Sequence, residues 1–97
     1  MGNYKLSGAS SNDVVGIYKF GIVTFGLYSA KEYVASLELF LEELSERPEL
    51  ARDASMFAKD LLFYRYKAHV IFYVFDGNNE ILVIRILGKR MDFIQHL

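Results

Sequence analysis

Residues 68–92 read AHVIFYVFDGNNEILVIRILGKRMD. The run His69–Phe75 is almost entirely β-branched and aromatic, and the run Ile81–Leu87 is apolar except for Arg85. Between them Asp76–Asn79 is rich in Gly and Asn, which tolerate the positive φ that hairpin turns need. Neither run alternates cleanly between apolar and polar residues, which predicts a β-hairpin covered on both faces. We therefore expect this hairpin to form the middle of a sheet.

A helix is expected on the N-terminal side of this hairpin. Ser10 and Asp13 have the spacing of an N-terminal capping box, with Asp in place of the usual Glu. A stripe of residues then recurs at helical spacing: Val14, Tyr18, Gly21 or Ile22, and Phe25. Gly16 and Gly21 each weaken this helix by about 1 kcal/mol relative to Ala, which indicates close approach by a neighbour. Gly26 is placed to end the helix.

A second helix follows at once. Ser29 and Glu32 form a second capping box, and Pro48 stops the helix by Arg47 or earlier. Its apolar stripe is expected to face the core: Ala30, Tyr33, Val34, Leu37, Phe40 or Leu41, and Leu44. The link between the two helices is only two or three residues long, so we expect an antiparallel helical hairpin.

The remaining segments are shorter. Asn3–Leu6 and Leu61–Tyr66 are predicted strands, Glu49–Asp60 is expected to be a loop with one helical turn near Leu50–Asp53, and Asp92–His96 a final helical turn. The order of elements predicts an α+β fold, in which an N-terminal helical hairpin packs on a small, mainly antiparallel β-sheet. A chain of 97 residues has room for one domain, and we assign residues 1–97 to it.

Composition narrows the class of protein. Residues 1–58 carry five Lys or Arg and eight Asp or Glu, whereas residues 59–97 carry six and four. The net charge of −1 is far from that of a general nucleic-acid binder, so no direct sequence-specific nucleic-acid binding is expected. The hydrophobic share of 53% is generous for so small a domain, which indicates apolar surface for a partner.

Localisation and cofactors are predicted from what the chain lacks. It contains no cysteine and no apolar run of signal-peptide or membrane-spanning length, which favours a cytoplasmic protein without membrane contact. It also shows no glycine-rich phosphate loop and no metal-ligand cluster, so no cofactor or metal is predicted.

The order and the residues together resemble the ParE branch of the ParE/RelE toxin superfamily, the toxin halves of bacterial toxin–antitoxin pairs. The resemblance covers nearly the whole chain and rests on these points: Tyr4-x-Leu6-Ser7, Phe25-Gly26, Ala30-x-x-Tyr33-x-x-x-Leu37, Arg47-Pro48, His69-Val70-Ile71-Phe72-Tyr73, Arg85-Ile86-Leu87, Arg90-Met91-Asp92 and His96-Leu97. Two positions depart from the family pattern. Gly88 stands where a histidine is usual, and Leu61-Leu62 stands where an arginine is usual, with Arg65 coming later.

The resemblance implies a toxin that poisons DNA gyrase and is neutralised by a ParD-like antitoxin, with which it can form a hetero-oligomer. The RelE branch, with the same fold, instead cleaves messenger RNA on the ribosome. A third possibility, suggested by Gly88, is a non-toxic remnant that retains antitoxin binding.

Two groups of residues are candidates for contact with these partners. The target-binding candidates are one residue of the last predicted strand and four residues that come after it: Arg85, Lys89, Arg90, Met91 and Asp92. Alternation places Arg85 with Val83 and Leu87, opposite a helix-facing set of Leu82, Ile84 and Ile86. Arg85 could instead pair with a carboxylate such as Asp92 or one on the second helix. The antitoxin-binding candidates lie on the helical hairpin and the sheet edge: Tyr18, Phe25, Tyr33, Leu37, Tyr64 and Arg65.

The sequence favours binding over catalysis. Cleavage of RNA requires an acid or base near the phosphate and several cations to stabilise the developing charge. His69 begins a strand, where a packed or hydrogen-bonded role is expected, and His96 stands in a terminus expected to fray. We therefore expect no catalytic residue and no enzymatic activity.

Overall fold

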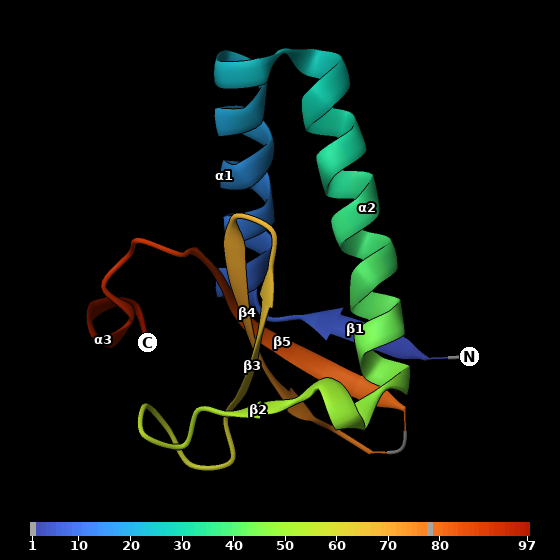
Figure 1. The fold of residues 1–97 in the computed structure, drawn as a ribbon, viewed down its shortest axis with the longest axis vertical. Helices are drawn as coiled ribbons and strands as arrows, with labels where there is room; N and C mark the ends of the chain where they lie inside the picture. The colour runs from blue at the N-terminus through green and yellow to red at the C-terminus, as the bar shows by residue number, and fades with distance from the viewer. Residues whose placement is uncertain (1, 78) are drawn as a thin grey trace.

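The computed structural model describes residues 2–77 and 79–97. A helical hairpin and a five-stranded sheet make up most of the chain (Figure 1). The elements in order are β1 (Asn3–Leu6), α1 (Gly8–Phe25), α2 (Leu27–Glu46), a 3-10 turn η1 (Pro48–Leu50), β2 (Arg52–Asp53), β3 (Leu62–Tyr66), β4 (His69–Phe75), β5 (Glu80–Gly88) and α3 (Phe93–His96). The strand order is β1-β5-β4-β3-β2, with β1 parallel to β5 and the other pairs antiparallel. The predicted α+β architecture is confirmed, and the predicted hairpin, β4 and β5, lies inside the sheet.

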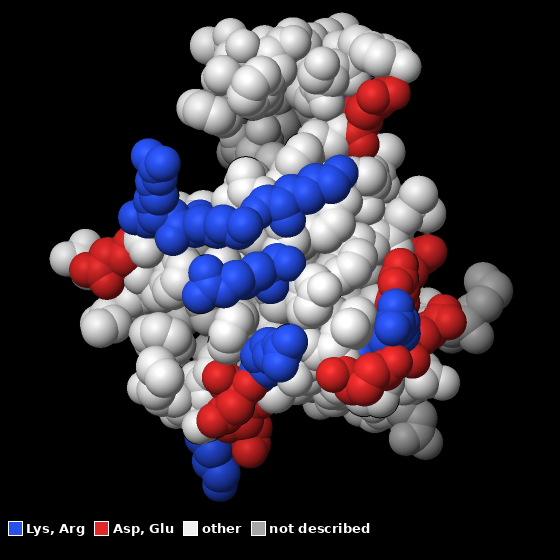
Figure 2. All heavy atoms as spheres, in the orientation of Figure 1, with Lys and Arg blue, Asp and Glu red and all other residues white. Residues whose placement is uncertain are grey.

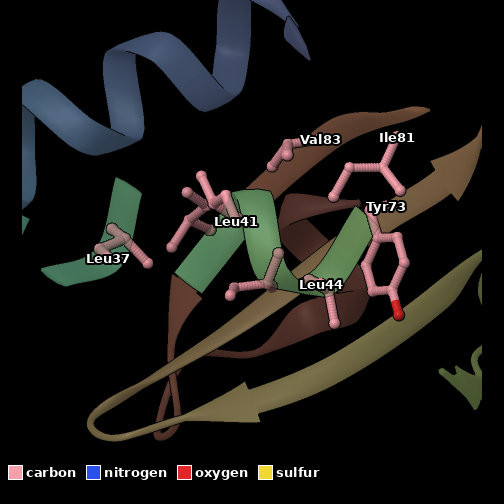
Figure 3. Packing of buried hydrophobic residues seen from close by; sticks show 8 residues of the cluster. Leu37, Leu41, Leu44, Tyr73, Ile81 and Val83 are labelled. Carbon is pink, nitrogen blue, oxygen red and sulfur yellow. The ribbon is translucent and has the colours of Figure 1, made fainter. Parts of the chain in front are cut away.

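The sheet has a hydrophobic cluster on each face. The first cluster joins the sheet to α2, whose leucines point toward Tyr73, Ile81 and Val83 (Figure 3). Its α2 members are the predicted stripe residues Leu37, Leu41 and Leu44, each at most 1% exposed. Burial of one such leucine side chain stabilises the fold by about 1.5–3 kcal/mol.

The second cluster lies on the opposite face. Val70 and Phe72 of β4 pack there with Leu87 of β5, and the loop after β2 covers them with Ala54 and Leu61. Phe57 from this loop and Phe93 of α3 contact Phe72 edge-on, with ring centroids 6.0 and 5.2 Å away. The α3 turn is therefore attached to this face through Phe93, which is partly buried against the cluster.

A β-bulge in β5 changes which residues face the helices. Phe72 pairs with Arg85 and the next residue, Tyr73, pairs with Val83, so Ile84 is the extra residue. An extra residue interrupts the alternation of side chains between faces. Here Val83 and Ile86 both belong to the first cluster, whereas Ile84 packs against the second.

The predicted helix-facing set in β5 is therefore only partly correct. Ile86 faces the helices as predicted, but Ile84 does not. Leu82 lies between Ile81 and Val83, both in the first cluster, so alternation places it on the opposite face. The prediction assumed unbroken alternation along the strand, which the bulge removes.

Both helices begin earlier than predicted. The N-cap of α1 is Ser7, whose hydroxyl accepts a hydrogen bond of 3.0 Å from the backbone N–H of Ser10. The predicted box of Ser10 and Asp13 is therefore wrong, and Asp13 has another role described below. The predicted box of Ser29 and Glu32 is also wrong, because α2 starts at Leu27 without a side-chain cap.

A single residue, Gly26, links the two helices with φ +97°. The predicted antiparallel hairpin is confirmed (Figure 1). Gly21 packs closely against α2, because a Cβ at this position would lie 3.1 Å from the Cβ of Ala30. A Cβ at Gly16 would meet nothing within 4 Å. The predicted close approach is thus correct at Gly21 and wrong at Gly16.

Two connections complete the comparison with the sequence. In the β4–β5 turn Gly77 and Asn79 have the predicted positive φ, while Asn78 lies outside the described residues. The segment 49–60 was predicted to be a loop with a helical turn near Leu50–Asp53. Instead the turn is η1, and Arg52–Asp53 is a two-residue strand paired with Leu62 and Phe63 of β3.

Candidate functional site

Side chains of α1 cover the edge of β5 where β1 ends. The parallel pairing of β1 with β5 stops at Leu6 and Val83. Beyond this point Ser7 Oγ donates to the carbonyl of Ile84 at 2.8 Å, and Ser10 Oγ donates to the carbonyl of Val83 at 2.9 Å. These two serine side chains thus continue the hydrogen bonding of the sheet edge beyond β1, which satisfies backbone carbonyls of β5 that no strand pairs.

Asp13 completes this edge and also holds Arg85. Its Oδ2 accepts from the backbone N–H of Ile86 at 2.9 Å and from Arg85 Nε at 2.8 Å, and its Oδ1 accepts from Arg85 Nη2 at 2.9 Å. The side chains of Asp13 and Arg85 are 13% and 22% exposed. The hydrogen bond with Asp13 raises the pKa of Arg85 above its ordinary value.

Arg85 also ties the C-terminus to the sheet. Its Nη1 donates to the backbone carbonyl of His96 at 2.7 Å. Arg85 therefore pairs with a carboxylate, which is one of the two interpretations that the sequence left open. The partner, however, is Asp13 of α1, and not the predicted Asp92 or carboxylate of α2. Since its donors are engaged in this way, Arg85 acts as an anchor and Lys89 and Arg90 remain as the cations that project from this end.

The segment after β5 is a compact turn. The backbone N–H of Lys89 donates to the carbonyl of Ala68 at 3.2 Å, and that of Met91 donates to the carbonyl of Gly88 at 3.1 Å. Asp92 caps α3, because its Oδ1 accepts from the N–H of Ile94 at 3.1 Å. Lys89, Arg90, Met91 and Asp92 are all exposed. The structure thus brings four of the five target-binding candidates together.

Two arginines lie on β3 and β2, two and three strands away from β5 in the sheet. Arg65 is exposed, pairs in register with Val70, and carries its guanidinium 5.9 Å from the ring centroid of Phe63. Arg52 is exposed and pairs with Phe63. Figure 2 shows Lys and Arg side chains in a band across this side of the molecule, over the β3–β4 hairpin and the C-terminal segment.

We call the exposed set Arg52, Arg65, Lys89 and Arg90 the second-face basic surface. Cross-strand partners project to the same face of a sheet, so Arg52 and Arg65 share the face of Phe63 and Val70, which is the face of the second cluster. Alternation from Leu87 places Lys89 on this face as well. Sequence reasoning missed Arg52 and assigned Arg65 to a different site.

The helical hairpin carries a shallow apolar groove of about 570 Å³ between α1 and α2. Tyr18 lines this groove together with Val14, Ile22 and Val34. The two helices also expose seven large apolar side chains, of which Val15 lines this groove while Phe20 and Leu39 line other hollows: Val15, Phe20, Val23, Phe25, Leu27, Tyr28 and Leu39. Of the antitoxin-binding candidates, Tyr18 therefore lines this groove, and Phe25 is exposed at the C-terminal end of α1.

The other antitoxin-binding candidates are dispersed. Leu37 is 0% exposed and belongs to the first cluster, so its prediction as a surface contact is wrong. Tyr64 is half-buried against Phe40 of α2, with ring centroids 5.3 Å apart. Arg65 belongs to the second-face basic surface. An apolar residue on the core stripe of α2 cannot be told from a surface contact by sequence alone.

Tyr33 and His69 form a hydrogen-bonded pair between α2 and β4. The Tyr33 hydroxyl and His69 Nδ1 share a hydrogen bond of 2.7 Å, and burial lowers the pKa of His69 below its ordinary value. Beside them the Tyr66 hydroxyl donates to Ser36 Oγ at 2.9 Å, and Lys67 Nζ lies 5.1 Å from the Tyr66 ring centroid. His69 is thus packed and hydrogen-bonded, as the sequence predicted.

The described part of the chain assembles neither a metal site nor a membrane span. In residues 2–77 and 79–97 no three or more acidic or histidine side chains converge as metal ligands. Among the helices of those same residues, none combines the length and the apolar character required to cross a bilayer. His96 is exposed, and its carbonyl is the acceptor for Arg85.

Comparison with known proteins agrees with this geometry. Residues 4–93 match the family described as the ParE toxin of type II toxin–antitoxin systems, parDE. A chain in a solved structure of the chromosomal ParDE toxin–antitoxin system from P. aeruginosa has the same fold, with a TM-score of 0.73 and 16% sequence identity over 91% of this chain and 95% of that chain. No curated protein sequence matches the chain significantly. Because the family match spans nearly all of the sequence, the chain belongs to the ParE toxins of type II toxin–antitoxin systems.

Proposed function

We propose that this ParE toxin inhibits DNA gyrase by direct contact, without breaking or forming bonds itself, and that a ParD-like antitoxin neutralises it. The observation that carries the proposal is the arrangement of the C-terminal end. Arg85 anchors this end to α1 and to the His96 carbonyl, while Lys89 and Arg90 extend into solvent without a carboxylate within salt-bridge distance among the described residues.

The arrangement of the histidines favours binding over ribonuclease action. A general acid or base must reach the reacting phosphate with a free ring nitrogen. His69 is half-buried with Nδ1 hydrogen-bonded to Tyr33, which leaves only Nε2 for such a role, and the other histidine, His96, is on a different element, the terminal turn α3. Exposed cations on a rigid support are what a protein needs to hold an acidic or DNA-bearing target.

The apolar groove of the helical hairpin supports the antitoxin part of the proposal. Tyr18, Val14, Val15, Ile22 and Val34 line the groove, and seven large apolar side chains are exposed on α1 and α2 as a whole. Extensive exposed apolar surface often marks a site where a partner binds. An antitoxin segment that is disordered when free could fold along this groove and bury its apolar side. Adding a ParD-like protein should raise the melting temperature by several degrees.

A supercoiling assay with purified gyrase tests the target. We expect the wild-type chain to inhibit supercoiling or to stabilise cleaved DNA complexes, and the double variant Lys89→Gln/Arg90→Gln to inhibit at least tenfold less. Lys5→Gln is the matched control for loss of positive charge. Lys5 lies on β1 at the far edge of the sheet and is 67% exposed in its pair with Glu80, so the control should inhibit like the wild type.

A second assay separates the two branches of the superfamily. Messenger RNA on translating ribosomes should stay intact in the presence of the chain. If the transcript is cut and gyrase is unaffected, the proposal is wrong and the chain acts as a ribonuclease. If neither target responds and bacteria expressing the soluble chain grow normally, the chain is a non-toxic remnant.

A further inference from the structure

Some lysines and arginines of the chain form ion pairs with carboxylates, and others do not. Lys5, Arg47 and Arg85 are each paired with a carboxylate within 3.3 Å. No such pair is formed, among the residues that the structure describes, by the members of the second-face basic surface or by four other lysines, Lys19, Lys31, Lys59 and Lys67, so position on the sheet rather than lack of a partner singles out this surface. The four cations of this surface come from three separate segments of the chain. Register and alternation place Arg52, Arg65 and Lys89 on one face of the sheet, and Arg90 follows Lys89 as an exposed residue of the same turn.

The two carboxylates that neighbour these cations in sequence, Asp53 and Asp92, bind local donors and form no ion pair among the described residues. Asp53 accepts from the backbone N–H and the hydroxyl of Ser55, both at 3.0 Å. Asp92 accepts from the N–H of Ile94. These acidic side chains satisfy local backbone donors and leave the guanidinium groups of Arg52, Arg65 and Arg90 free for an external anion.

The spacing of the surface fits a charged polymer. Arg65 pairs with Val70, and Val70 pairs with Leu87, so Arg65 and Leu87 lie two strand spacings, about 10 Å, apart. Duplex DNA carries one phosphate charge per about 1.7 Å of its axis. A face of this width therefore meets several phosphates at once, in whichever register the duplex lies.

We propose that the second-face basic surface binds the phosphate backbone of duplex DNA without reading its sequence. This proposal rests on the proposed function in one respect, since it assigns the bound duplex to the DNA that gyrase holds. Three of the four cations are arginines, whose planar fork matches the oxygens of a phosphate. The toxin would then contact the protein and the DNA of its target together.

An acidic protein segment is the competing occupant, and the surface favours it less. A peptide brings backbone N–H donors along with its carboxylates, and these donors need acceptors. The side chains of the second-face basic surface offer only donors. The small net charge of −1 means that the affinity for DNA alone is weak and strongly dependent on salt.

The experiment measures fluorescence anisotropy of a labelled 20-base-pair duplex of arbitrary sequence against the folded wild-type chain, between 25 and 200 mM salt. Four phosphate contacts predict a slope of log K against log salt concentration of about −3.6. Arg65→Gln and Arg90→Gln should each reduce the slope by about 0.9, and the double variant to about −1.8. Lys5→Gln, which removes the same charge on β1, should leave the slope unchanged.

Three results would overturn the proposal: no binding of the duplex at 25 mM salt, equal weakening by Lys5→Gln and Arg90→Gln, or tighter binding of a poly-glutamate peptide than of the duplex under the same conditions. The last would assign the surface to an acidic protein partner. Circular dichroism of each variant confirms that the fold is intact. Because this assay contains no gyrase, it can fail while gyrase inhibition holds, and it can succeed while gyrase inhibition fails.

Discussion

Replacing Asp13 with alanine should destabilise the fold more than an alanine substitution of any other residue of α1 near the surface. The carboxylate accepts three hydrogen bonds, two from Arg85 and one from the backbone N–H of Ile86. Without it the guanidinium and the N–H both lose their acceptor while remaining largely buried. Breaking a buried ion pair costs about 3–5 kcal/mol, and we expect about 3 kcal/mol because water reaches Arg85, which is 22% exposed.

Urea unfolding followed by circular dichroism at pH 7 measures this loss. For a small domain the slope m is about 1–3 kcal/mol per molar urea, so a loss of about 3 kcal/mol lowers the midpoint by at least about 1 M. Asp13→Asn retains one acceptor oxygen and should fall between the wild type and Asp13→Ala. Since Arg85 also binds the carbonyl of His96, the loss should loosen the C-terminal end and increase proteolysis there.

A double-mutant cycle tests the reasoning itself. Arg85→Met should destabilise the wild type but cost much less in the Asp13→Ala background, because removing both side chains leaves no unpaired charge. A coupling energy below about 0.5 kcal/mol, or a loss of less than 1 kcal/mol for Asp13→Ala, would refute the claim that this pair holds the C-terminal end.

Three further changes test other features by the same unfolding measurement. Gly16→Ala should stabilise α1 by about 0.5–1 kcal/mol, since the new Cβ enters open space. Gly21→Ala should give no gain, because its Cβ would lie 3.1 Å from the Cβ of Ala30. Equal gains for the two variants would contradict the close packing at Gly21. Tyr73→Phe should be neutral or stabilising by up to about 1 kcal/mol. The Tyr73 hydroxyl is buried with no hydrogen-bond partner among the described residues, and burial raises the pKa of Tyr73 to about 12. A clear loss of stability would contradict the absence of a partner. His69→Gln should flatten the dependence of stability on pH between 7 and 5. Burial lowers the pKa of His69 in the folded state, so the unfolded state binds the proton more readily. The wild type therefore loses stability as pH falls through about 6.5, the pKa of a histidine in an unfolded chain. Parallel curves would show that His69 does not carry this dependence.

The fold was largely predictable because its strongest patterns are local. The unbroken apolar runs of β4 and β5, the stripe Leu37, Leu41 and Leu44, and the turn chemistry at Gly77 depend on neighbours within a few residues. Their positions in the structure agree with the sequence. The helix starts were less predictable, because Ser7 and Ser10 have equal capping chemistry and only the pairing of β1 with β5 decides between them.

The candidate site was predictable only where it is contiguous in sequence. Lys89, Arg90, Met91 and Asp92 were found because they follow β5 directly. The pair of Asp13 and Arg85 joins residues 72 positions apart, and the bulge at Ile84 depends on how β5 meets β4. Arg52 was missed because β2 has two residues and cannot show a periodicity.

The parallel pairing of β1 with β5 bears on when the toxin becomes active in a cell. Asn3 pairs with Glu80 and Leu6 with Val83, so the first strand cannot find its neighbour until the last strand has left the ribosome. Contacts this distant along a chain form slowly. During synthesis the apolar sides of α1 and α2 are therefore made well before the sheet that covers them, and a co-expressed antitoxin has time to arrive before a finished toxin exists.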